Sequence, residues 1–148
     1  MKLRIAIATV LSLAATACGD QQAAQSQGAG QSECFQNYRV EGTAGVTAMN
    51  FRTFRNFTGL NPDIALKNLR AAMLAEGFSN IAVDAAGGAL TAVQETSGSG
   101  RPQTLRVSAR NVGGGTRVDG VFMIQPGQMT NASYVRSALC RVIDAANL

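Results

Sequence analysis

The 148-residue sequence contains no histidine and no tryptophan, and only 5% of its residues are aromatic and 15% charged. Without histidine, the chain lacks the Ser-His and Cys-His catalytic pairs, an imidazole general base and every histidine-containing zinc site. We therefore expect no catalytic residue, no metal and no cofactor. The length predicts one small domain.

The first 17 residues have the pattern of a secretory signal. Lys2 and Arg4 supply positive charge, and residues 5–15 form an unbroken run of apolar and small residues. This run is too short for a stable membrane-spanning helix, which needs about 20 apolar residues. Small residues precede Cys18 where a signal peptidase would cleave, so we expect residues 1–17 to be removed and Cys18 to begin the mature chain.

The stretch Leu13-Ala14-Ala15-Thr16-Ala17-Cys18 resembles the lipobox of bacterial lipoproteins, although the commonest form has leucine where this chain has Ala15. The resemblance covers only these first 18 residues. It implies that acyl chains on Cys18 hold the protein in a membrane. Gly19 at the next position implies the inner leaflet of the outer membrane, facing the periplasm. The alternative is a secreted soluble protein with a free Cys18 thiol.

Residues 18–33 follow as a polar linker, because residues 19–33 contain no apolar side chain larger than alanine. Such a segment cannot bury enough surface to offset the entropy of ordering it. A flexible chain of this length has a root-mean-square span of roughly 20 Å. The composition therefore predicts a tether between a membrane-held cysteine and a folded domain at 34–148.

Three cysteines are present, and acylation of Cys18 leaves Cys34 and Cys140 as an even pair. In an oxidising compartment such a pair is expected to form a structural disulfide. The alternative is a redox-active thiol, which needs neighbours that stabilise a thiolate. Neither cysteine lies in a Cys-x-x-Cys motif, and Arg141 is the one basic residue beside them.

The segment 34–148 predicts an α+β fold, an antiparallel sheet of about five strands with two helices packed on one face. Asn61-Pro62-Asp63 has the pattern of a helix start, and Gly77 ends that helix. Glycines 113–115 predict a hairpin turn. The expected order is a strand at 46–57, a helix from 62, strands at 81–84, 89–94, 104–111 and 116–125, and a last helix capped by Thr130 or Asn131.

This order, behind a lipobox-like signal and a polar linker, is similar to that of the small helix-grip domains of bacterial envelope lipoproteins. The similarity rests on element order alone and assigns no site residue. It implies a non-enzymatic accessory or structural role in the cell envelope, within an envelope protein complex.

Four arginines offer a second hypothesis. Arg106 and Arg110 share one face of a predicted strand, the hairpin brings Arg117 close to Arg110, and Arg101 precedes the same strand. Together they form a candidate site for an anionic envelope ligand such as a lipid headgroup, lipopolysaccharide or a glycan. The alternative is a solvated sheet face whose like charges prevent edge pairing. Without residues 1–17 the formal net charge falls from +4 to +2, and the compartment also argues against nucleic acid as a partner.

A small hydrolase is the third hypothesis. It requires two carboxylates about 5 to 10 Å apart, for which Asp84, Glu95 and Asp119 are candidates. Ser97 and Ser99 have no histidine to activate them and are better interpreted as part of a flexible loop. The glycines at 113–115 lack the Lys-Ser/Thr pair of a phosphate-binding loop.

Overall fold

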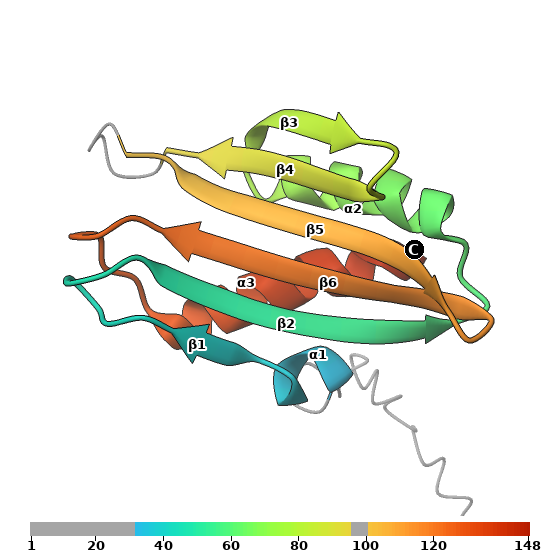
Figure 1. Cartoon of the computed structure of the whole chain (residues 1–148), viewed down its shortest axis with the longest axis horizontal. Helices are drawn as coiled ribbons and strands as arrows, with labels where there is room; N and C mark the ends of the chain where they lie inside the picture. The colour runs from blue at the N-terminus through green and yellow to red at the C-terminus, as the bar shows by residue number, and fades with distance from the viewer. Residues whose placement is uncertain (1–31, 96–100) are drawn as a thin grey trace, which may run out of the picture.

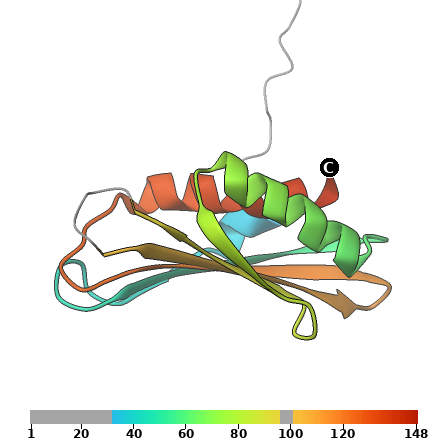
Figure 2. The same cartoon turned by 90° about the horizontal axis from the view of Figure 1, so that it is seen from above.

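The computed structural model describes residues 32–95 and 101–148 (Figure 1). Six strands form a single antiparallel sheet in the order β1-β2-β6-β5-β4-β3. The strands are β1 (Arg39–Glu41), β2 (Met49–Thr58), β3 (Ser79–Asp84), β4 (Ala89–Gln94), β5 (Gln103–Val112) and β6 (Gly115–Ile124). The helices are α1 (Glu33–Gln36), α2 (Pro62–Ala75) and α3 (Ala132–Asp144), followed by a 3-10 turn at Ala145–Asn147. Helices α2 and α3 lie on one face of the sheet, and the described residues leave the other face uncovered (Figure 2).

The predicted α+β class and antiparallel sheet are confirmed, but the predicted count of about five strands and two helices is wrong. The sheet has six strands, and a third helix, α1, precedes it. Both additional elements, α1 and β1, are only three or four residues long. Neither is long enough to show a hydrophobic period, which is the signal that sequence analysis uses. Glu33, predicted as the end of the linker, is the first residue of α1.

Both ends of α2 form as the sequence predicts. The Asn61 side chain accepts a hydrogen bond from the Asp63 amide at 2.8 Å, and Pro62 is the first helical residue. At the other end Gly77 adopts a φ of +86°, and the Phe78 amide donates to the Met73 carbonyl at 3.0 Å. This is the Schellman ending, in which glycine takes the left-handed conformation and the next residue folds back over the last turn.

The core lies between the sheet and the two longer helices. Every second residue of β6 points toward the helices and is buried. Gly120 lies on this face, where an added Cβ would come within 2.9 Å of Ile143 and 3.1 Å of Leu139. The absence of a side chain at this position therefore lets α3 pack directly on the backbone of β6.

The predicted disulfide is present and joins Cys34 of α1 to Cys140 of α3, with 5.7 Å between their Cα atoms. It holds α1 against the outer edge of β2, beyond the three residues that β1 pairs. There the Glu33 carboxylate accepts a hydrogen bond from the Asn56 amide at 2.8 Å, and the Asn37 side chain donates to the Phe54 carbonyl at 3.2 Å. The short helix thus satisfies backbone groups that an edge strand would leave exposed.

Removing the disulfide should strongly destabilise the domain, because it closes a loop with a sequence separation of 106 residues. We expect Cys34→Ala/Cys140→Ala to lower the free energy of unfolding by about 4 kcal/mol, from the denatured-state entropy that the bond removes. Urea denaturation followed by circular dichroism measures the change. An unchanged midpoint would show that α1 and α3 hold their places without the bond.

A second link to α3 comes from Tyr38, whose hydroxyl donates to the Ala132 carbonyl at 2.9 Å. Burial raises the pKa of Tyr38 from 10.0 to about 12, and the positive charge of Arg136 opposes that rise. The neutral phenol is therefore favoured in the folded state.

This pKa gives the stability a dependence on alkaline pH. Because the folded pKa lies above the unfolded one, the contribution of Tyr38 is complete below pH 10 and is lost as the pH rises toward about 12. The loss should be about 1 kcal/mol, since the partly exposed ring feels only part of the burial penalty. Urea unfolding at pH 9 and pH 11.5 should show a smaller difference for Tyr38→Phe than for the unchanged chain. Equal differences in the two proteins would contradict the assignment.

Candidate functional site

The uncovered face of the sheet brings together arginines from three strands. Arg110 and Arg117 are register partners on β5 and β6, as the predicted hairpin requires. Asp119 forms ion pairs with both, at 3.3 Å to Arg110 and 2.8 Å to Arg117. The Arg117 guanidinium also lies 3.6 Å from the centre of the Phe54 ring. These two arginines are therefore held in place and share one carboxylate.

Arg106 has a different environment on the same face. It is the register partner of Val121, and Arg52 is the partner of Val121 on the other side. Arg52 forms an ion pair with Glu41 at 3.0 Å. Arg106 donates to the Thr91 hydroxyl at 3.4 Å and, among the residues that the structure describes, has no carboxylate within ion-pair distance. Arg106 thus carries one unneutralised charge on this face, and the single Asp119 carboxylate leaves a second one between Arg110 and Arg117.

Arg101 does not join this group. Its side chain donates to the Pro126 carbonyl at 2.7 Å, and its own carbonyl accepts from the Gln128 side chain at 2.7 Å. It precedes β5, whereas Arg110 lies near the far end, so the two are about 30 Å apart along an extended strand. The arginine face is accordingly Arg52, Arg106, Arg110 and Arg117. Sequence analysis missed Arg52, because only the pairing of β2 with β6 brings it near Arg106.

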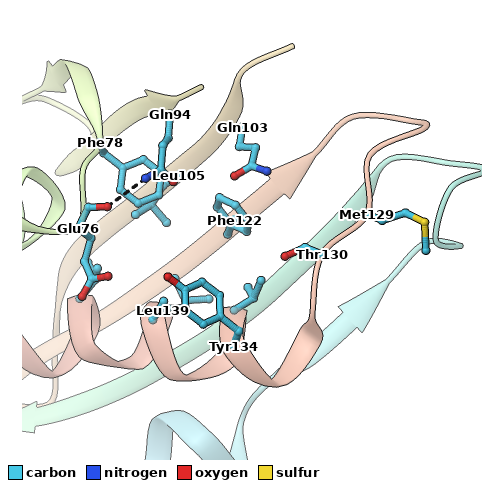
Figure 3. Close-up of a pocket in the computed structure, with 13 residues that line it drawn as sticks. Glu76, Phe78, Gln94, Gln103, Leu105, Phe122, Met129, Thr130, Tyr134 and Leu139 are labelled. Atoms are coloured by element: carbon cyan, nitrogen blue, oxygen red, sulfur yellow. Dashed lines mark hydrogen bonds between the residues drawn. The ribbon is translucent and has the colours of Figure 1, made fainter. Parts of the chain in front are cut away.

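The opposite face of the sheet contains a pocket of about 320 Å³, bordered by α3, the end of α2 and strands β4 to β6 (Figure 3). Its floor is apolar, formed by Phe78, Leu105 and Phe122. The rings of Phe78 and Phe122 meet edge to face, with their centres 6.1 Å apart. Ala138 and Leu139 line the wall from α3.

Polar side chains line the pocket beside its apolar floor. Gln94 and Gln103 are register partners on β4 and β5, and the Gln94 side chain donates to the Glu76 carbonyl at 3.1 Å. The Glu76 carboxylate accepts two hydrogen bonds from Arg141, at 2.8 and 3.0 Å. These bonds raise the pKa of Arg141 above its ordinary value. Glu76, the only carboxylate among the described residues that line the pocket, is thus paired with a permanent positive charge.

The mouth of the pocket is bordered by two large exposed side chains. Met129 is 77% exposed and Tyr134 is 65% exposed, and both line the opening. Single exposed apolar side chains are common on protein surfaces. Two such side chains beside one opening form an exposed apolar surface that a ligand can cover.

Two of the carboxylate candidates, Asp84 and Asp119, lie on β3 and β6, which are not neighbours in the sheet. The Asp84 carboxylate accepts a hydrogen bond from the Gly87 amide within a turn, and Asp119 lies among the arginines. Ser97 and Ser99 lie outside the described residues, as does Cys18. Within residues 32–95 and 101–148, no three His, Cys, Asp or Glu residues are placed to hold a metal ion. The glycine turn forms the β5–β6 hairpin, as predicted.

The sequence matches no family model and no curated protein. None of the helices in the described part of the chain is long and apolar enough to cross a membrane. Function must therefore be inferred from the two faces of the sheet and from the cysteines.

Proposed function

We propose that this chain is a membrane-anchored lipoprotein of the bacterial envelope, facing the periplasm, with a non-enzymatic accessory or structural role. The observation that carries this proposal is how the three cysteines are paired. Cys34 and Cys140 are joined to each other, so Cys18 is the only cysteine left, and it directly follows the signal-like residues 1–17. Disulfides persist in oxidising compartments, of which the periplasm is one.

The position of the fold in the chain supports an anchor at Cys18. The described fold begins at Ser32, and the residues between it and Cys18 are polar or small. A segment of this composition spans roughly 20 Å when flexible, which separates a domain from the membrane surface. Such an arrangement leaves the uncovered face of the sheet accessible to a partner in an envelope complex.

Intact mass spectrometry of the protein extracted from membranes tests the proposal. We expect a mature chain that begins at Cys18 and carries additional mass equal to acyl chains. Alkylation should modify no cysteine before reduction and two after it, because Cys34 and Cys140 are joined. Cys18→Ser is the control, since it removes the acceptor thiol and leaves the fold unchanged. An unacylated protein with an alkylatable Cys18 would overturn the anchor.

A second function is favoured by one observation: within the described part of the chain, no carboxylate lies at ion-pair distance from Arg106. An exposed guanidinium can bind a phosphate or carboxylate through two parallel hydrogen bonds. Arg52, on the other side of Val121, adds a second guanidinium to the same face. We propose as the alternative that the arginine face binds an anionic envelope ligand, with a lipid headgroup as the simplest case.

Vesicles that contain phosphatidylglycerol test this alternative on the mature chain with Cys18→Ser, which removes the acyl anchor. We expect Arg106→Ser to weaken binding about fivefold, the effect of one basic residue near an anionic surface, and Asp119→Asn to strengthen it by releasing Arg110 and Arg117. Arg70→Ser on the exposed side of α2 removes the same charge from the other side of the molecule. An equal loss from Arg70→Ser would show that net charge alone drives binding.

A further inference from the structure

We infer that the pocket between α3 and the sheet binds a small uncharged amphiphile, meaning a molecule with an apolar body and one hydrogen-bonding end. Its volume of about 320 Å³ lies at the lower end of the range of about 300–1,000 Å³ for small-molecule sites. The pocket lies on the helix face of the sheet, opposite the arginine face. The inference therefore depends neither on an anchor at Cys18 nor on an anionic ligand at Arg106.

We infer the apolar body of the ligand from the apolar floor of the pocket. Phe78, Leu105 and Phe122 come from three separate segments and are each no more than 8% exposed. Their neighbours already fix their positions, since Phe122 contacts both Phe78 and Phe51 through ring packing. The floor is thus formed before a ligand arrives, and binding costs little reorganisation of the protein.

The hydrogen-bonding end is specified by the glutamines. The Gln94 amide nitrogen donates to the Glu76 carbonyl, which leaves the Gln94 amide oxygen as an acceptor on a residue that lines the pocket. Gln103 lies beside it on the next strand, and the Tyr134 hydroxyl faces the pocket from α3 (Figure 3). Amide and hydroxyl groups both donate and accept, so they suit an alcohol, amide or amine N–H.

The charge of the ligand is specified by Glu76 and Arg141. Both oxygens of the Glu76 carboxylate accept from Arg141, so the pair is neutral as a unit. Among residues 32–95 and 101–148, no basic side chain lines the pocket. An ionised headgroup would have to leave water without an opposite charge to receive it, which is costly. The site therefore selects a neutral headgroup.

The mouth suits a ligand that projects partly into solvent. Met129 is flexible and adapts to irregular apolar surfaces, and Tyr134 combines an apolar ring with a polar tip. Both are largely exposed without a ligand. The apolar part of a bound ligand would pack against these two side chains and shield them from water.

The fluorophore N-phenyl-1-naphthylamine, which is uncharged and has one N–H group, tests the site on the mature chain with Cys18→Ser. We expect saturable binding at one site per chain. Ala138→Phe places a ring in the pocket from α3 and should weaken binding at least tenfold. Ala71→Phe, the matched control on the exposed side of α2, should leave binding unchanged. Decanol should displace the probe at least ten times more effectively than decanoate at pH 8.

Several results would overturn the inference. These are the absence of saturable binding, an equal loss in Ala71→Phe, or decanoate that competes as well as decanol. If Ala138→Phe fails to fold, Ala138→Leu makes the same test with a smaller side chain. Methyl NMR spectra then provide an independent readout, because decanol should shift the signals of Leu105, Leu139 and Val142. Shifts confined to other methyl groups would also refute the site.

Discussion

The disulfide between Cys34 and Cys140 joins the first helix of the fold to the last, and the edge of the sheet depends on that link. Strand β2 is long, but β1 pairs with only its first part. The rest of its outer edge is covered by Glu33, which accepts from the Asn56 amide, and by Asn37. These contacts come from the four-residue helix α1 and from Asn37, its C-cap residue, and a helix this short has little stability of its own. The covalent bond adds to these contacts by joining the helix to α3.

The two faces of the sheet differ in chemical character. Alternation along β5 and β6 places apolar side chains toward the helices and arginines toward solvent. The first face holds a pocket with a neutral polar end, and the second holds Arg106 beside Arg52, with Asp119 neutralising part of the remaining charge. Antiparallel sheets commonly leave one face solvated, so the uncovered face is consistent with the fold itself. Its arginines outnumber the carboxylates that pair with them, so that face is positively charged.

The features that sequence analysis predicted correctly depend on short-range signals or on simple counting. Asn61 and Gly77 bound α2 because cap chemistry acts within a few residues, and the disulfide followed from cysteine parity. Features that arise from long-range geometry were missed. Arg52 approaches Arg106 only through the register of β2, β6 and β5. The pocket depends on where α3 lies over the sheet, which Gly120 permits but hydrophobic periodicity does not encode.

The same disulfide determines how the domain would carry a mechanical load. Cys34 lies two residues after Ser32, where the described chain begins. Its disulfide with Cys140 encloses residues 35–139 in a covalent loop. If the domain were pulled away from an anchor at Cys18, the tension would pass from Cys34 through the disulfide into α3. It would not separate β1 from β2. The force would then act on a helix buried against the middle of the sheet. The edge strand β1, which pairs with β2 at only three positions, would be spared.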